Sequence, residues 1–240
     1  MSPSAGRREA ICYHESSMLL FGHIGLTLGA TWGAQHALEI KEHRARDASG
    51  DAPGDTHLRP SFAHKLLLFV RRLDYRIIMV ASMLPDIIDK PIGAFFFRET
   101  FSSGYIYGHT LLFFILTALA GLYLYKSRRI TWGLALSIGV FTHLVFDRIW
   151  HAPRTLFWPL LGSSFAREDV SIIIPPILRE PALNAGDLNN WIPDVLRNWL
   201  TLPRDYVPEI AGITVLLLFA CVLIRRKQVL HFLKRGRIGG

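Results

Sequence analysis

The chain has 240 residues, of which 50% are hydrophobic and 19% are charged, and its mean hydropathy is +0.27. Its formal net charge of +8 would suit nucleic-acid binding, but Lys and Arg stand mostly in short segments beside apolar runs, as topology signals do. We therefore expect an integral membrane protein that binds no nucleic acid and forms one domain over residues 1–240. The two cysteines, Cys12 and Cys221, cannot form a disulfide framework.

Apolar runs predict an all-α fold, a polytopic helical bundle with about five transmembrane segments. Four runs reach the roughly 20 residues that a spanning helix needs: residues 18–38, 104–125, 131–150 and 207–224. A fifth, residues 77–88, is short, so it needs a tilt, local thinning of the bilayer or an extension at the interface. If it crosses, the two ends of the chain lie on opposite sides of the membrane. If it is re-entrant, they lie on the same side.

Lys and Arg predict the orientation. Of the 27 in the chain, 17 lie in residues 39–76, 126–130 and 225–240. Because cytoplasmic segments are rich in these residues, we expect an outer N-terminus and a cytoplasmic C-terminus in the cell membrane. Arg7 and Arg8 favour the opposite orientation, since a signal anchor also begins with basic residues.

Three segments are expected to lie outside the bilayer core. Residues 44–61 are rich in Gly, Pro, Asp and Ser and predict a mobile cytoplasmic loop. The stretch "FAHKLLLFVRRLD" suits a basic amphipathic helix on the membrane surface. Residues 151–206 form an extracytoplasmic region in which Trp191, Val195 and Trp199 predict an interfacial helix.

Six side chains that can bind a metal are expected within about 10 Å of the outer membrane face. They come from four apolar runs and are His23, Asp86, Asp89, His109, His143 and Asp147. The last two are four residues apart, so they can share one ion on a helix face, and the two earlier aspartates, three apart, can do the same. Imidazole and carboxylate ligands suit zinc, or a pair of divalent ions, with manganese as an alternative.

Each of these residues also has a purely structural explanation. A single intramembrane His commonly forms hydrogen bonds between helices, and an Asp at the end of a span is commonly solvated. The whole set favours a metal, because a charge within a span costs roughly 2.5–3.5 kcal/mol. Gly25, Gly29 and Gly33 have the four-residue spacing that allows close helix packing.

A break is expected before the two aspartates. Pro85 lacks a backbone N–H and its ring disturbs a helix, so the turn that carries Asp86 should be kinked or newly started. Asp86 would then point inward to the metal, while Asp89 reaches the open mouth of the site.

Four segments resemble the motifs of the YdjM-like membrane-bound metal-dependent hydrolases. They are "FGHIGLTLG", "LPDIIDKPIG", "YGHTLLF" and "THLVFDRIWHAPRTLFWPLLG", and the resemblance covers about residues 18–162. That family is regarded as a distant relative of the zinc-dependent phospholipase C and single-strand nuclease superfamily, whose members are all-helical enzymes with multi-zinc sites. The resemblance implies one to three zinc ions on His23, Asp86, His109, His143 and Asp147, with Asp89 as a ligand or a general base.

The chain departs from this family at the third motif. Many relatives have an Arg before the His and a Ser after it, whereas this chain has Gly108 and Thr110. Arg148 or Arg98 could replace the missing phosphate contact, and Arg148 is the catalytic candidate of the two.

The function predicted from the sequence is hydrolysis of a phosphoester in a lipid or other amphiphile at the outer membrane–water interface. Asp89 would accept the proton, with Glu209 as the next candidate if both aspartates bind metal. A cation or proton-coupled transporter is one alternative, but it needs polar groups down to the inner face, where residues 131–150 offer little beyond Ser137 and Thr131. A scaffold that needs metal only for folding is the other, and protein ligands would fill every coordination position of its ion.

Overall fold

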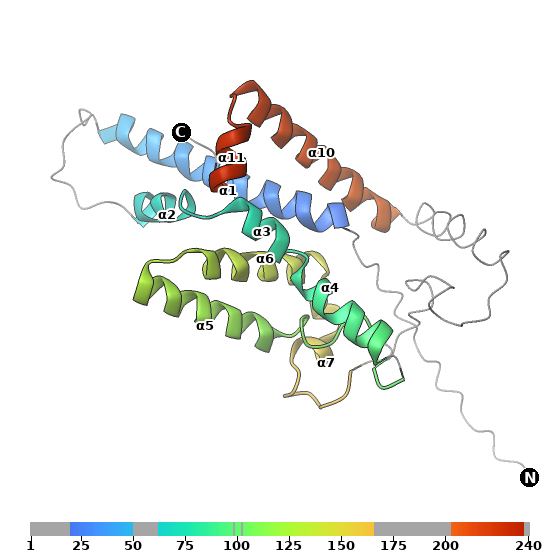
Figure 1. Ribbon diagram of the computed structural model, residues 1–240. Coiled ribbons are helices and arrows are strands. Elements are labelled where there is room, and N and C mark those ends of the chain that lie inside the picture. Colours follow the sequence, from blue (N-terminus) through green and yellow to red (C-terminus); the bar gives the residue numbers. More distant parts are fainter. Residues whose placement is uncertain (1–19, 50–61, 98, 102, 166–202, 238–240) are drawn as a thin grey trace, which may run out of the picture.

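The computed structural model describes residues 20–49, 62–97, 99–101, 103–165 and 203–237, and every regular element in them is a helix (Figure 1). The elements are α1 (Leu20–Ser49), α2 (Phe62–Val70), α3 (Tyr75–Ala81), α4 (Leu84–Asp89), the π-helical η1 (Lys90–Phe96), α5 (Leu111–Arg128), α6 (Trp132–Phe146), the 3-10 turn η2 (Ile149–His151), α7 (Pro153–Leu156), α10 (Pro203–Arg225) and α11 (Val229–Arg235). The all-α prediction is confirmed for these residues.

Helices α1 and α10 form a parallel pair that lies on one side of the fold (Figure 1). A Cβ at Gly25 would collide with the backbone of Gly212, and one at Gly29 would lie 3.1 Å from Val215. The first two glycines of the predicted stripe therefore serve close packing, as expected. Gly33 does not, because a Cβ there would meet no atom within 4 Å.

Helices α5 and α6 form an antiparallel hairpin on the other side. Gly121 and Gly133 let their backbones approach, since a Cβ at Gly121 would lie 2.6 Å from the carbonyl carbon of Gly133. Helix α3 packs on α6, where Gly139 accommodates Ala81 and the carbonyl of Ile78. Because α3 also contacts α1, it joins the two helix pairs.

Several boundaries differ from the sequence prediction. Helix α5 starts only at Leu111, because the Thr110 hydroxyl accepts a hydrogen bond from the N–H of Phe113 and caps it; residues 104–110 form a loop instead. Helix α1 continues to Ser49, so residues 44–49, expected in a loop, are helical. The expected interfacial helix around Trp191 lies outside the described residues.

The chain breaks where Pro85 predicts it. Helix α3 ends at Ala81, and α4 starts at Leu84 with Pro85 in its first turn. The proline thus sits where a missing N–H costs nothing, and a new helix begins directly before Asp86. The expectation of a newly started turn is confirmed.

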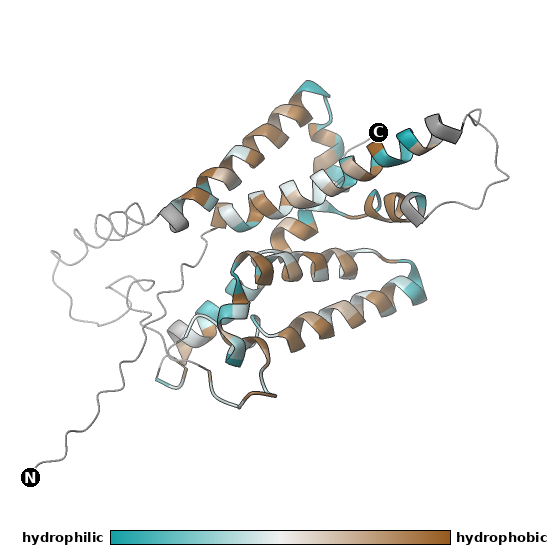
Figure 2. Ribbon diagram, turned by 180° about the vertical axis from the view of Figure 1, so that it is seen from behind, coloured by the Kyte–Doolittle hydropathy of each residue, from teal (hydrophilic) through white to brown (hydrophobic). Residues whose placement is uncertain are grey.

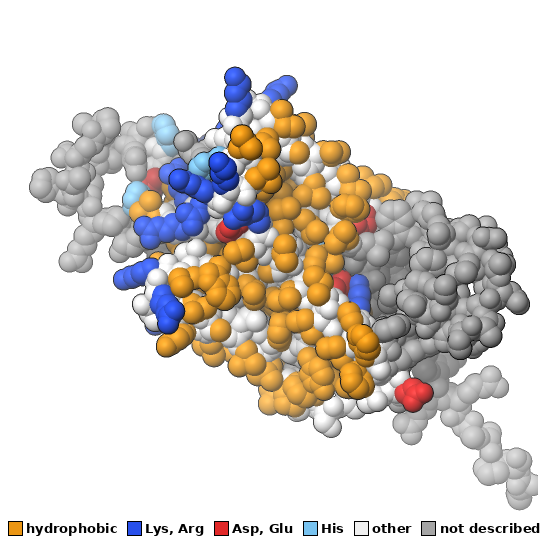
Figure 3. Space-filling model, viewed as in Figure 1, with side chains coloured by type: hydrophobic (Ala, Val, Ile, Leu, Met, Phe, Trp, Pro, Cys, Tyr) orange, Lys and Arg blue, Asp and Glu red, His pale blue; other side chains and the backbone are white. Residues whose placement is uncertain are grey.

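Within the described residues, two helices are long and apolar enough to cross a membrane, α5 and residues Tyr206–Arg225 of α10, whereas α6 is apolar but has only 15 residues. Hydrophobic residues run along most of α5 and α10 (Figure 2) and form a broad band on the surface, with Lys and Arg gathered at one end (Figure 3). The exposed apolar side chains of α5 include Leu112, Ile115, Leu116, Leu119 and Leu122. Such a band suits contact with lipid chains.

Candidate metal centre

Four side chains each bring one ligand atom within 4.8 Å of the others: Asp86, His109, His143 and Asp147. Asp86 lies in the first turn of α4, His109 in the loop before α5, and His143 and Asp147 at the end of α6. All four are buried. The break at Pro85, the cap at Thr110 and the four-residue spacing in α6 therefore direct three separate segments to one point.

The two imidazoles have defined orientations. Nδ1 of His143 lies 2.6 Å from the carbonyl oxygen of Ser82, and Nδ1 of His109 lies 2.7 Å from Oδ2 of Asp89. Because both partners are acceptors, each Nδ1 carries the hydrogen in the neutral ring and each Nε2 presents a lone pair. These two Nε2 atoms lie only 3.0 Å apart. Two lone pairs that face each other repel, unless a cation lies between them.

The carboxylates add negative charge at the same point. Oδ2 of Asp147 lies 3.3 Å from Nε2 of His143 and 3.4 Å from Nε2 of His109. Oδ1 of Asp86 lies 3.6 Å from Nε2 of His109. Oδ1 of Asp86 and both oxygens of Asp147 are buried and have no hydrogen-bond partner among the described residues. Because buried polar atoms without a partner are costly, this set of nitrogen and oxygen atoms fits a divalent ion such as zinc.

His23 lies directly beside this cluster. Its Nε2 is 3.0 Å from Oδ1 of Asp147, and its ring stacks on that of His143 with 4.2 Å between centroids. Neither ring nitrogen of His23 has a hydrogen-bond partner in the described part of the chain. Asp147 thus directs one oxygen to His23 and the other to His109 and His143.

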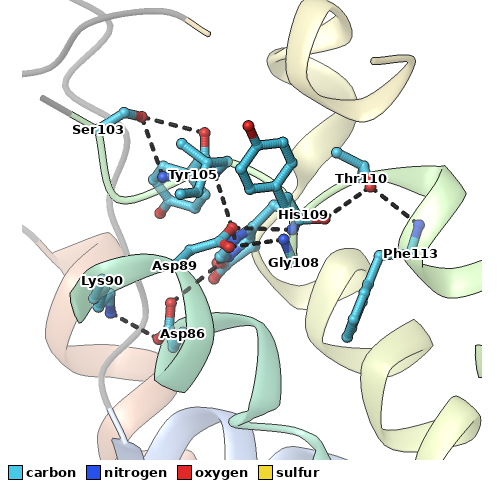
Figure 4. A network of polar contacts seen from close by, with 12 residues as sticks. Asp86, Asp89, Lys90, Ser103, Tyr105, Gly108, His109, Thr110 and Phe113 are labelled. Carbon is cyan, nitrogen blue, oxygen red and sulfur yellow. Dashed lines mark hydrogen bonds and ion pairs between the residues drawn. The ribbon is translucent and has the colours of Figure 1, made fainter. Parts of the chain in front are cut away.

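Asp89 lies behind His109 rather than at an open mouth. It is fully buried and accepts four hydrogen bonds (Figure 4). Oδ1 takes the N–H of Gly108, and Oδ2 takes those of Ile106 and His109 together with Nδ1–H of His109. The expected position at the mouth is therefore not what the fold adopts, because the loop before α5 closes over the carboxylate.

The other candidates lie outside the cluster. Arg148 follows Asp147 but is exposed, with a left-handed backbone (φ 53°), and Arg98 lies outside the described residues. Glu209 is buried in α10, and its oxygens accept the N–H groups of Phe21 and Gly22 at distances of 3.0 and 2.9 Å. It therefore caps the start of α1, directly before His23.

Two groups that contact the cluster were not predicted from the sequence. The Ser82 carbonyl that orients His143 is a backbone group, so no residue type signals it. Lys90 is different: its Nζ lies 2.7 Å from Oδ2 of Asp86, four residues before it. That spacing is visible in "LPDIIDKPIG" and could have indicated the ion pair.

A model of the YdjM inner membrane protein family matches residues 18–229. The chain belongs to this family. The match extends past residue 162, so α10 and its Glu209 fall within the region that defines the YdjM family. Searches of curated proteins and of solved structures gave no match.

Proposed function

We propose that this YdjM family protein is a membrane-bound metal-dependent hydrolase that cleaves a phosphoester of a lipid or other amphiphile at the outer membrane–water interface. The main support is the 3.0 Å approach of two imidazole Nε2 atoms, those of His109 and His143. Both rings have their Nδ1 atoms engaged, and two buried carboxylates face the same point. A divalent ion compensates all of these groups at once.

The position of His23 favours more than one ion. If Asp86, His109, His143 and Asp147 held a single ion, four protein ligands would close its tetrahedral shell, as in a structural zinc site. His23 and Oδ1 of Asp147 could hold a second ion, and five side chains shared between two ions would leave room for water and substrate. Zinc is the proposed metal, with two or three ions in the site.

When bound, such ions would supply positive charge that polarises a phosphoester oxygen and acidifies water. The chain itself contributes orientation. Asp89 holds the His109 ring through Nδ1–H, and the Ser82 carbonyl holds the His143 ring in the same way. Partners of this kind fix the ring and its tautomer, and raise the basicity of the ligand nitrogen. We therefore propose an orienting role for Asp89 rather than the proton transfer that the sequence suggested.

The location of the site supports an outer, lipid-facing substrate. Helix α5 runs from the site to a last turn with Lys126 and Arg128, and α10 runs from Glu209 to Arg225. The site and the basic helix ends thus lie at opposite ends of the bundle. Because Lys and Arg mark the cytoplasmic side, we propose five crossings, by α1, α3 with α4, α5, α6 and α10, and an outer site.

Metal analysis of the purified full chain, followed by phosphoester hydrolysis with and without chelator, tests this function. We expect at least one zinc or manganese ion per chain and hydrolysis that stops when the metal is removed. A protein without metal refutes the proposal. Bound metal without hydrolysis of any lipid phosphoester favours the scaffold, and chelator-sensitive cation uptake into proteoliposomes favours the transporter.

A further inference from the structure

Lys90 is a cation in direct contact with the candidate metal centre. Its ammonium lies 2.7 Å from Oδ2 of Asp86 (Figure 4), while Oδ1 of the same carboxylate faces the imidazoles of His109 and His143. The lysine and a metal ion would therefore use different oxygens of Asp86. They do not compete, so Lys90 stays in place beside a loaded site.

The side chain of Lys90 is more exposed to solvent than the side chains around it. The Lys90 side chain is 25% exposed, whereas that of Asp86 is 5% exposed and that of His143 is fully buried. The lysine thus lies where the buried cluster meets solvent or headgroups. An ammonium has three N–H donors, and Asp86 takes one of them, so donors remain for a ligand.

The backbone holds Lys90 at this place. Its N–H donates to the carbonyl of Asp86, and its ammonium binds the carboxylate of the same residue. The π-helical turn η1 starts at Lys90, with Pro91 next. Wide turns of this kind are rare and often occur at functional sites. Gly93 lets η1 approach the loop before α5, since a Cβ there would collide with the carbonyl of Ser103.

We propose that Lys90 forms an anion subsite at the entrance of the metal centre and binds an oxyanion of the substrate phosphate. This inference rests on the proposed function and names the group that recognises the substrate. Lysine binds phosphate as a point charge, and partial burial strengthens that attraction. The phosphate is either that of a lipid headgroup or free in solution.

Phosphate binding to the zinc-loaded full chain in a neutral detergent tests the subsite. Inorganic phosphate is titrated by calorimetry into wild type, Lys90→Met, Lys90→Arg and the control Lys126→Met, which lies at the opposite end of α5. We expect Lys90→Met to weaken phosphate binding about tenfold or more with its zinc content unchanged, as loss of a charged hydrogen bond implies. Lys90→Arg should restore most of the affinity, and Lys126→Met should bind as wild type.

The outcomes separate this inference from the proposed function. Zinc-loaded wild type that binds no phosphate, or Lys90→Met that binds it as wild type, overturns the subsite and leaves the metal centre intact. Loss of zinc from Lys90→Met also overturns it, because the lysine then only supports Asp86. Wild type that binds neither zinc nor manganese refutes the proposed function itself. Micelles with phosphatidate then identify the source: tighter binding than to inorganic phosphate indicates a lipid headgroup, and equal binding indicates free phosphate.

Discussion

The Nε2 atoms of His109 and His143 lie 3.0 Å apart although the two residues are 34 positions apart in the chain. Each ring is fixed from behind, one by Asp89 and the other by the Ser82 carbonyl, so neither can turn its N–H toward the other without losing a buried hydrogen bond. The pair therefore needs a metal ion or a proton between the two nitrogens. Metal should stabilise the folded chain as well as serve chemistry.

Loss of a ligand should remove metal. We expect His143→Ala and Asp147→Ala each to lower bound zinc or manganese severalfold, because each deletes a group that faces the cluster. His231→Ala in α11 is the matched control and should keep its metal. Elemental analysis of the purified proteins decides the matter. Wild-type metal content in both variants would remove the basis for the centre.

Asp89→Asn should weaken metal binding about 10- to 100-fold, the usual effect of losing the group that orients a ligand His. The side-chain NH2 of Asn would also face N–H groups that now donate hydrogen bonds to the carboxylate. Two donors that face each other cannot form a hydrogen bond. Zinc affinity is measured by competition with a chelating dye. Normal zinc affinity with lost turnover would instead identify Asp89 as the general base.

Gly108→Ala should destabilise the fold by about 1–3 kcal/mol, the usual cost of overpacking. The new methyl group would lie 2.9 Å from Cα of Pro85 and 3.1 Å from Oδ1 of Asp89, so it presses on the hydrogen bonds that hold His109. Gly33→Ala is the matched control, because that position is open. Thermal unfolding in detergent, with and without zinc, measures both. Equal stability of the two variants would contradict the tight contact at residue 108.

Glu209→Ala should cost about 1–2 kcal/mol of stability, as loss of a helix cap does. The N–H groups of Phe21 and Gly22 would lose their acceptor, and the start of α1 would loosen beside His23. We expect zinc affinity to fall as well. Glu209→Gln keeps one acceptor oxygen and should lie between wild type and Glu209→Ala in thermal unfolding. If Glu209→Ala lost this stability but bound zinc as tightly as wild type, the cap on α1 would make no contribution to metal binding.

The orientation of the protein has its own test. A reporter fused after Gly240 should lie in the cytoplasm, and one inserted near Asn184 should lie outside, because the basic helix ends mark the inner side. Reporter enzymes that act on only one side of the membrane give the answer. The reverse pattern would move the metal centre to the cytoplasmic face and make a cytosolic substrate the better hypothesis.

The main apolar helices and the convergence of four of the six candidate ligands could be predicted because they follow from local signals. Apolar length identifies α5 and α10, and Pro85 marks the start of α4. Spacing in α6 places His143 and Asp147 on one face. Since consecutive helices alternate in direction, the ligands near their ends meet at one level of the bundle.

The orienting contacts could not be predicted, because they depend on the path of a loop and on pairs distant in sequence. Asp89 binds backbone N–H groups 17 to 20 residues later, and every residue type carries such a group. The same is true of the Ser82 carbonyl. Glu209 accepts a hydrogen bond from Gly22, 187 positions earlier, and no local sequence pattern near either residue indicates this contact. Sequence spacing indicates which residues share a helix face, but not which group forms the hydrogen bond that orients a given side chain.

The cap on α1 can form only late in synthesis of the chain. The N–H groups of Phe21 and Gly22 leave the ribosome long before Glu209, which must come from α10. Until then, the first turn of α1 has to find other acceptors, and His23 is not yet held beside Asp147. The ribosome therefore makes His23 and the residues of the candidate metal centre first, and the residue that caps the helix of His23 last. This side of the centre acquires its final geometry only when α10 packs beside α1.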